Sequence, residues 1–104
     1  MIKKMDLICL HPAYSFYHND CKVGQFKIVN RDDCREIWCF EIYGEFRGMG
    51  LGQQMLKELI EMFSDMPLEL GCGKKNEKAL HIYQKYGFKI IKDSDYYYWM
   101  RKEI

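Results

Sequence analysis

Hydrophobic positions follow two different repeats along this chain, and the change falls close to residue 50. Before that point, runs rich in Val, Ile, Phe, Tyr and Trp predict β-strands at residues 7–10, 14–18, 22–29 and 36–43. Asn19 and Asp20 are suited to a hairpin turn between the second and third runs, and residues 30–33 form a second turn signal. The first part of the chain is therefore expected to form strands joined by short turns.

The run at residues 36–43 carries apolar side chains on both faces of a strand. Strict alternation places three residues on one face: Trp38, Phe40 and Ile42. The opposite face then holds Ile37, Cys39, Glu41 and Tyr43. Because both faces are largely apolar, we expect this strand to lie in the interior of a sheet.

After residue 50 the repeat becomes helical. The spacing of Leu51, Met55, Leu59, Ile60, Met62 and Phe63 predicts a helix over residues 51–63. A second helix is predicted at residues 77–86, where Asn76 is a suitable N-cap and Gly87 a suitable terminator. The remaining strands are expected at residues 68–70, 88–91 and 96–101.

This order of elements indicates an α/β (α+β) fold. Strands come first, followed by strand–helix–strand–helix–strand–strand, which predicts a mixed central β-sheet with parallel pairing near its centre and flanking helices. At 104 residues the chain has room for one core, so residues 1–104 are expected to form a single domain.

Composition and charge narrow the possible functions. With 16 basic and 15 acidic residues the net charge is +1, which argues against a general nucleic-acid binder. No run approaches 18 apolar residues, and residues 7–10 are too short for a signal peptide, so neither a membrane span nor secretion is expected. The five cysteines are odd in number and lack a C-x-x-C pair, which predicts reduced thiols, mostly buried, in a cytoplasmic protein. The three histidines lack metal-ligand spacing, so no metal is expected.

The glycine-rich stretch between the strand at residues 36–43 and the helix at 51–63 carries the strongest chemical signal. It comprises Arg47, Gly48, Met49, Gly50, Leu51 and Gly52. Glycines let a backbone approach a ligand closely, and the N-terminus of the following helix favours an anion, so this loop predicts a phosphate site.

Three common phosphate loops do not fit this stretch. A P-loop requires Lys followed by Ser or Thr, and that pair is missing. A dinucleotide loop starting at Gly48 would need its third glycine at Gln53. A kinase loop has the same spacing and belongs to a far longer chain.

The pattern that fits is R-x-x-G-x-G, formed by Arg47, Gly50 and Gly52, and preceded by Glu45-Phe46. About 25 residues later the chain reads N-x-x-A-x-x-x-Y-x-K-x-G-F, from Asn76 to Phe88. Together these elements resemble the GNAT superfamily of N-acetyltransferases over residues 36–91. The family usually carries two helices between its first two strands. The roughly 30 residues before the central strands look too few and too β-like to hold both, so we expect a GNAT-like fold with N-terminal helices reduced or absent and an open acceptor side.

The resemblance implies acetyl-coenzyme A as cosubstrate. The backbone from Arg47 through Gly52, including Met49 and Leu51, would wrap its pyrophosphate, and Asn76 would hydrogen-bond the pantothenate arm. The arm would lie in a splay between the strands at residues 36–43 and 68–70, near Phe40 and Ile42. A free N–H at the end of the first strand would polarise the thioester carbonyl. The alternatives are a glycine turn without ligand and a plain N-cap at Asn76.

The resemblance also assigns catalytic candidates. Tyr83 would lie near the thioester sulfur and protonate the leaving thiolate, whereas helical spacing alone would make it a core tyrosine. Glu36 and Glu41 are candidate bases for the amine, directly or through water, and the alternative for each is a solvated strand glutamate. Lys74 and Lys75 precede the second helix and are expected to be solvated rather than bound to phosphate.

The expected function is transfer of acetyl to a primary amine by direct attack, with a protein lysine or N-terminal amine as acceptor. Two alternatives remain open: a small-molecule amine (polyamine or aminoglycoside-like) acetyltransferase with a pocket completed by a dimer, and a non-catalytic coenzyme A-binding module. The aromatic run at residues 96–99 bears on this choice. One of its faces is expected to be core, and the other to line an acceptor groove or the seam of a homodimer.

Overall fold

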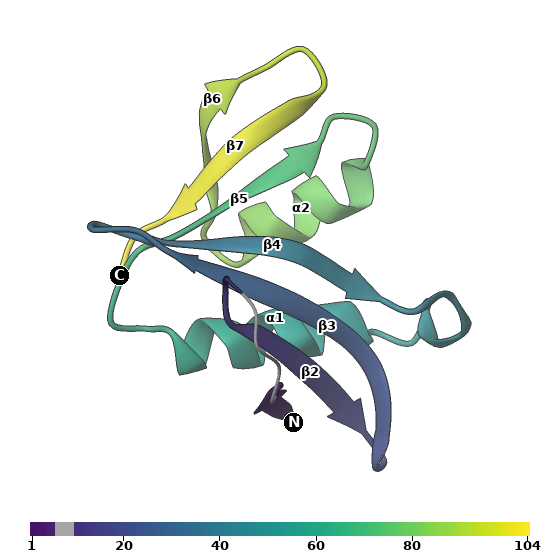
Figure 1. Ribbon diagram of the computed structural model, residues 1–104. Coiled ribbons are helices and arrows are strands. Elements are labelled where there is room, and N and C mark those ends of the chain that lie inside the picture. Colours follow the sequence, from purple (N-terminus) through teal and green to yellow (C-terminus); the bar gives the residue numbers. More distant parts are fainter. Residues whose placement is uncertain (6–9) are drawn as a thin grey trace.

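The computed structural model describes residues 1–5 and 10–104, which form one seven-stranded sheet with two α-helices (Figure 1). The strand order across the sheet is β1-β2-β3-β4-β5-β7-β6. The strands are β1 (Ile2–Lys4), β2 (Ala13–His18), β3 (Cys21–Asn30), β4 (Arg35–Ile42), β5 (Leu68–Gly73), β6 (Lys89–Asp93) and β7 (Tyr97–Lys102). The helices are the 3-10 turn η1 (Gly44–Phe46), α1 (Leu51–Met62) and α2 (Glu77–Lys85). This is the mixed, GNAT-like sheet that the sequence predicts.

The N-terminal half of the sheet is antiparallel. Asn19 and Asp20 have φ values of 51° and 63°, the left-handed pair of a type I′ hairpin turn, so the predicted turn is confirmed. Strand β1 pairs with β2 and was not expected from the sequence. The strand expected at residues 7–10 lies outside the described residues except for Leu10, which is in a bend. The described residues between β1 and β2 contain no helix, in agreement with the expected loss of the N-terminal helices.

Strands β4 and β5 run parallel and then separate. Their register holds for three pairs, Arg35 with Leu68, Glu36 with Glu69, and Ile37 with Leu70. Beyond Ile37 and Leu70, β4 stays with β3 while β5 stays with β7, and the two strands diverge (Figure 1). The predicted splay is therefore present, and it opens next to Trp38 and Gly71.

A β-bulge at Cys39 corrects one sequence prediction. Gln25 faces Glu41, yet Lys27 faces Trp38, so one residue of β3 opposes two residues of β4. Cys39 itself has φ of 53°, in the left-handed region. The bulge shifts the alternation, so Phe40 and Ile42 pack against the core while Trp38 lies on the opposite face and is 46% exposed. The prediction that Trp38 shares a face with Phe40 and Ile42 was wrong.

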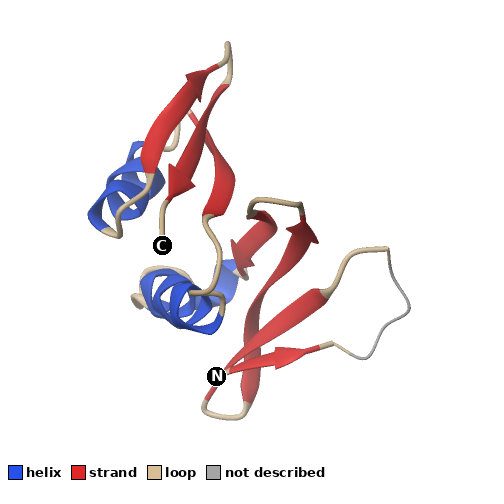
Figure 2. Cartoon of the chain, turned by 90° about the vertical axis from the view of Figure 1, so that its left-hand side faces the viewer, coloured by secondary structure: helices blue, strands red, loops and turns tan. Residues whose placement is uncertain are grey.

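Both α-helices cover the same face of the sheet (Figure 2). Helix α1 buries a stripe of Leu51, Met55, Leu56 and Leu59, each burial contributing roughly 1.5–3 kcal/mol. The sequence pattern omitted Leu56 and included Met62, which is 47% exposed because it lies in the last turn. Helix α2 buries no residue completely and packs one side against the core. The other face of the sheet carries no helix among the described residues.

Two further predictions are settled in part. No helix in the described part of the chain has the length and apolar character needed to cross a bilayer. The four described cysteines are free thiols, as expected. Only Cys34 and Cys72 are buried, however, while Cys21 and Cys39 are exposed, so the expectation of mostly buried thiols was half right.

Candidate active site

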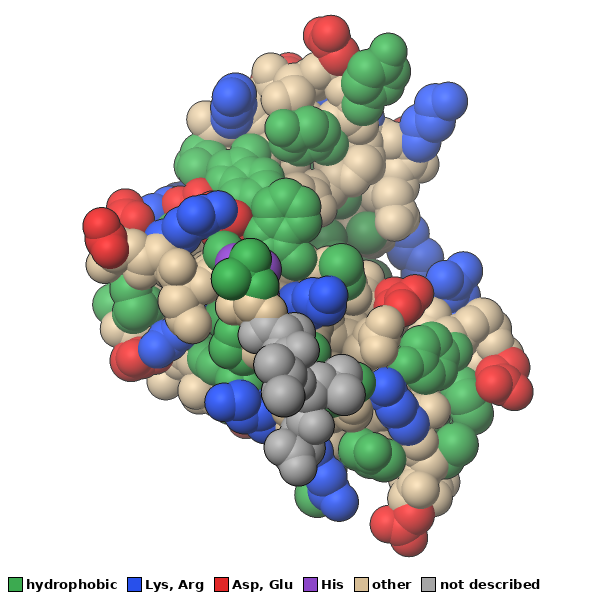
Figure 3. Space-filling view, in the orientation of Figure 1, with side chains coloured by type: hydrophobic (Ala, Val, Ile, Leu, Met, Phe, Trp, Pro, Cys, Tyr) green, Lys and Arg blue, Asp and Glu red, His purple; other side chains and the backbone are tan. Residues whose placement is uncertain are grey.

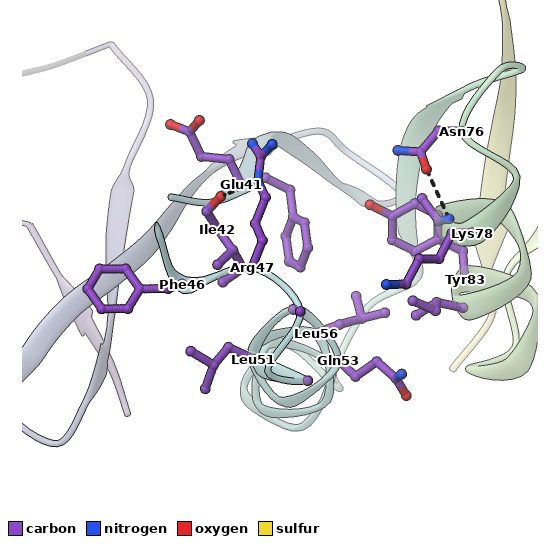
Figure 4. Close-up of a pocket in the computed structure, with 16 residues that line it drawn as sticks. Glu41, Ile42, Phe46, Arg47, Leu51, Gln53, Leu56, Asn76, Lys78 and Tyr83 are labelled. Atoms are coloured by element: carbon purple, nitrogen blue, oxygen red, sulfur yellow. Dashed lines mark hydrogen bonds between the residues drawn. The ribbon is translucent and has the colours of Figure 1, made fainter. Parts of the chain in front are cut away.

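A cavity of about 540 Å³ lies between the end of β4, beyond the point where β4 leaves β5, and the two α-helices. Figure 4 shows its three sides: the end of β4 and the glycine loop, the start of α1, and the start of α2. Most of the residues singled out from the sequence line it: Phe40, Glu41, Ile42, Arg47, Gly48, Gly50, Leu51, Gly52, Asn76 and Tyr83. Residues up to 43 positions apart in sequence, from Phe40 to Tyr83, thus line the same cavity.

The glycine loop presents an uncompensated row of backbone amides. Gly48 and Gly50 have φ values of 81° and 76°, which L-residues rarely adopt. The first helical bond of α1 runs from Gln54 N–H to Gly50 O, and the N-cap has no side-chain acceptor. None of the N–H groups of residues 48–53 donates to a protein acceptor in the described structure, and the first turn of α1 contains no acidic residue. The positive end of the helix is therefore available to an anion.

Gly52 differs from the other two glycines. Its φ is not positive, and a Cβ built there would meet only Ile42 Cγ1, at an ordinary 3.7 Å. The protein itself therefore does not require glycine at this position. Because Gly52 lines the cavity, the absence of a Cβ leaves room for a ligand to approach the backbone there.

Arg47 and Met49 flank the loop in different ways. The Arg47 Nε donates to the carbonyl oxygen of Ile42 at 3.0 Å, which ties the loop to the end of β4 (Figure 4). Met49 is 60% exposed and does not line the cavity. Only its backbone N–H is therefore suited to the expected contact with a pyrophosphate.

Tyr83 lies on α2 between two phenyl rings. Its ring centroid is 6.3 Å from that of Phe40 and 5.9 Å from that of Phe88, both edge to face. Its hydroxyl points into the cavity toward β4 and makes no hydrogen bond within the described structure (Figure 4). Burial, with a smaller contribution from Cys72, raises the pKa of Tyr83 to about 12. The phenol therefore stays protonated, with an unused donor, throughout the physiological range.

The start of α2 supplies polar groups to the opposite wall. Asn76 Oδ1 accepts from the Ala79 N–H at 3.2 Å, so Asn76 is an N-cap and lines the cavity at once. Lys78 also lines the cavity, and sequence reasoning missed it because nothing in its spacing distinguishes it from other surface lysines. Lys74, by contrast, pairs with Asp93 and lies over the Tyr98 ring, which agrees with a role away from phosphate.

The two candidate bases have different surroundings. Glu41 belongs to the part of β4 that lines the cavity, but it alternates with Phe40 and Ile42, so its carboxylate points away from the helices and accepts a hydrogen bond from Gln25 Nε2 at 2.9 Å (Figure 4). Glu36 does not line the cavity: it accepts from Arg31 Nε at 3.1 Å and from Trp38 Nε1 at 2.9 Å. Both carboxylates thus project from the helix-free face of β4, and only the Glu41 position lies along the stretch that lines the cavity.

One cluster in the described residues has the composition of a metal site. Cys34, Glu36 and Glu69 offer ligand atoms within 4.8 Å of one another. The carboxylates are already engaged, Glu36 with Arg31 and Glu69 with Arg101. Burial and the neighbouring carboxylates raise the pKa of Cys34 to about 11, so its thiolate is disfavoured. The cluster is therefore better described as two ion pairs beside a thiol.

The glycine loop, the free N-terminus of α1 and the cavity beside them form a candidate site for a phosphate-bearing ligand in a mixed, splayed sheet. A family model described as the acetyltransferase (GNAT) family matches residues 5–88. This chain belongs to that family, and the resemblance found in the sequence is confirmed. A search of curated proteins finds no match.

Solved structures share the fold at low sequence identity. A GNAT-family acetyltransferase from Bacteroides thetaiotaomicron, described as putative, superposes with a TM-score of 0.79 at 18% identity, over 95% of this chain and 65% of that one. An IAA acetyltransferase from Bacillus cereus gives 0.78 at 21%, over 90% and 78%. A GNAT acetyltransferase from Elizabethkingia anophelis, solved with acetyl-CoA bound, gives 0.74 at 21%, over 90% and 76%. The chain therefore spans about two thirds to four fifths of the length of these relatives.

Proposed function

We propose that this chain is an acetyl-CoA-dependent N-acetyltransferase that transfers acetyl to a primary amine by direct attack. The observation that carries the proposal is the row of six unbonded amides at residues 48–53 in front of a helix with no acidic first turn. A diphosphate is the ligand that such a row fits best, and GNAT relatives have been crystallised with acetyl-CoA and with CoA.

The cavity fits an elongated cosubstrate in other respects. Gly52 allows a ligand to approach the backbone, while Arg47 and Lys78 add positive charge near the phosphates. Phe40 and Ile42 line the route along β4, whose edge is released from β5 beyond Ile37. That edge offers main-chain groups to an amide-containing arm, and Asn76 offers a side-chain amide from the other wall.

Tyr83 is proposed to stabilise the departing sulfur. In the reaction a nitrogen–carbon bond forms as the carbon–sulfur bond breaks, the nitrogen loses one proton and the sulfur gains one. With its pKa at about 12, Tyr83 is a hydrogen-bond donor at neutral pH, but complete proton transfer to a simple thiolate would be uphill by roughly 3 pKa units. We therefore assign Tyr83 a donated hydrogen bond in the transition state, with solvent restoring any proton it passes on.

The amine must lose its proton to a base. Glu41 and Glu36 are the two candidates, directly or through water, and both carboxylates project from the helix-free face of β4. Both remain in the proposal, since their hydrogen bonds to Gln25 and to Arg31 and Trp38 leave each carboxylate with further acceptor capacity.

The acceptor is proposed to be a protein lysine or N-terminal amine. The face of the sheet opposite the α-helices carries no helix in the described structure (Figure 2), and Trp38 and Tyr97 are exposed there. This favours an acceptor presented by a larger molecule. A small-molecule amine with a pocket completed in a homodimer is the second candidate, because the edge strand β6 is wholly exposed and available for pairing.

The test is acetyl transfer measured by mass spectrometry. The purified chain is incubated with acetyl-CoA and either a lysine-containing peptide panel or a panel of polyamines and aminoglycosides. A mass increase of about one acetyl group that depends on enzyme supports the proposal. Coenzyme binding by calorimetry without transfer to any amine would indicate a binding module, and the absence of binding heat would overturn the proposal as a whole.

A further inference from the structure

The helix-free face of the splay carries an aromatic pair that the cavity does not use. Trp38 on β4 and Trp99 on β7 lie with ring centroids 6.2 Å apart and planes tilted by 51°. Their neighbours in sequence, Ile37 and Met100, are buried on the helix side, so both indoles project from the opposite face. Figure 3, which looks onto this face, shows hydrophobic side chains gathered over β5 and β7.

The pair lies directly over the start of the splay. Trp38 follows Ile37, and Gly71 follows Leu70, the last paired residues of β4 and β5. The six-membered ring of Trp99 rests over Gly71, where a Cβ would meet it at 3.4 Å, and Tyr97 lies alongside at 3.6 Å. Nothing lies within 4 Å of a Cβ at Gly73. The rings therefore cover Gly71 and leave open space at Gly73, and we call the cluster of Trp38, Trp99 and Tyr97 the aromatic notch.

Each indole N–H is bound to a carboxylate. Trp38 Nε1 donates to Glu36, and Trp99 Nε1 donates to Glu69. Glu36 and Glu69 are direct partners across the parallel pair, and each is also held by an arginine, Arg31 or Arg101. An indole that donates to an anion gains negative charge on its ring face, which strengthens the attraction of that face for a cation.

We propose that the aromatic notch binds the alkylammonium group of a lysine side chain presented by another protein, a proposal that rests on the amine-acetylating function above. A cation above the midpoint of the two rings lies within roughly 6 Å of both centroids, which is the range of cation–π attraction. Trp38 is 46% exposed and Tyr97 is 42% exposed, so the notch covers one side of a ligand only. Such a site suits a side chain tethered to a larger surface better than a free small amine, which needs enclosure.

The position of the notch connects it to the reaction. The cavity approaches the splay from the helix side, through Phe40 and Tyr83, while the notch lies at the beginning of the same splay on the other face. An amine bound at the notch would lie across the sheet from an acyl group held beside Tyr83, next to the point where β4 and β5 begin to separate. Glu36 and Glu69 lie beside the notch, each already paired with an arginine and with an indole N–H.

The chain reports on the notch directly, because it contains two tryptophans and both are in it. Choline, a cation that cannot be N-acetylated, and 3,3-dimethylbutan-1-ol, its neutral isostere, are titrated into the whole protein with tryptophan fluorescence as the signal. The proposal expects a saturable change with choline and at least a tenfold weaker response to the neutral alcohol. Equal responses would overturn it.

Steady-state acetylation of a lysine peptide supplies the second measurement. Trp38→Ala is expected to raise the KM for the peptide about fivefold or more, with the KM for acetyl-CoA within about twofold. Tyr96→Ala is the matched control, since Tyr96 is 86% exposed and lies outside the notch. An unchanged peptide KM in Trp38→Ala, or a lower KM for spermidine than for the peptide, contradicts the proposal. If wild-type protein acetylates no amine, the proposed function fails, whereas a choline response that exceeds the alcohol response still supports the cation site.

Discussion

Phe40 and Tyr83 meet edge to face across the mouth of the splay, with ring centroids 6.3 Å apart. The contact joins β4 to α2, the two walls that no backbone pairing connects at this point. It fixes the position of the Tyr83 ring and leaves the hydroxyl directed into the cavity (Figure 4). The ring of Tyr83 therefore makes the packing contacts, while its hydroxyl is the proposed hydrogen-bond donor, so a mutation can remove one without the other.

Removing only the Tyr83 hydroxyl should lower turnover without weakening the fold. Tyr83→Phe keeps both ring contacts and deletes a hydroxyl that has no protein partner in the described structure, so we expect the free energy of unfolding to change by less than about 0.5 kcal/mol. Turnover should fall at least tenfold, with little change in the Kd for acetyl-CoA measured by calorimetry. Tyr86→Phe, outside the cavity, is the control. Undiminished turnover in Tyr83→Phe would remove Tyr83 from the mechanism.

The raised pKa of Tyr83 predicts a pH window for stability. Burial raises the pKa from 10.0 to about 12, so between these values the unfolded chain loses a proton that the folded chain keeps. Stability from this group is complete below pH 10 and is lost as pH rises toward 12, at a rate on the order of 1.4 kcal/mol per pH unit. Urea melts from pH 9 to 12 should show a steeper loss for wild type than for Tyr83→Phe. Parallel curves would show that Tyr83 titrates normally.

Two glycines of the loop should respond differently to alanine. Gly50→Ala places a Cβ at φ of 76° and should destabilise the fold by about 1 kcal/mol. Gly52→Ala meets only Ile42, at 3.7 Å, so its melting midpoint should match wild type while its affinity for acetyl-CoA falls at least tenfold. Gly44→Ala, in open space and outside the cavity, should change neither quantity. Wild-type affinity in Gly52→Ala would show that no ligand approaches the loop there.

The pH dependence of kcat/KM should distinguish the two candidate bases. We expect Glu41→Gln to remove the acid-side limb of the profile, because Glu41, unlike Glu36, belongs to the part of β4 that lines the cavity. Glu36→Gln should keep that limb and cost less than about 1 kcal/mol of stability, since its partner Arg31 is 55% exposed. The reverse pattern would assign the base to Glu36, and two unaltered profiles would exclude direct roles for both.

Local signals explain why the coenzyme half could be predicted. Gly48 and Gly50 adopt positive φ, which favours glycine, and Asn76 caps α2, which favours a short polar side chain. Both requirements select a particular residue type at a particular position, so they can be recognised in the sequence. The face of Trp38 was missed because it depends on the bulge, which is set by pairing with β3 and has no local signature. Lys78 was missed for a related reason: its place in the cavity depends on how α2 docks across the splay.

The same reasoning explains the aromatic notch. Alternation along a strand puts Tyr97 and Trp99 on the same face, so this part of the notch follows from the sequence pattern. That Trp38 comes to lie beside Trp99 was not, because the two residues are brought together by the order β4-β5-β7 across the sheet and by the bulge at Cys39. Non-local topology, rather than composition, creates this site.

The bulge at Cys39 yields the last prediction. A β-branched residue is disfavoured in the left-handed region, so Cys39→Val at φ of 53° should lower the free energy of unfolding by about 1–2 kcal/mol. Cys39→Gly should be neutral or stabilising, because relief of strain offsets the added freedom of the unfolded chain. Cys21→Val is the matched control: Cys21 is also an exposed thiol on a strand, and its φ is not positive.

Urea melts of the three variants check this prediction, with acetyl-CoA affinity as a second readout. Because the bulge turns Phe40 and Ile42 toward the cavity, a valine that straightens β4 should weaken coenzyme binding as well as the fold. Glycine should preserve both, since it accommodates the left-handed conformation without a Cβ. Equal urea midpoints for Cys39→Val and Cys21→Val would mean that β4 runs without a bulge. Trp38 and Phe40 would then lie on the same face of the sheet, which would contradict the placement described above.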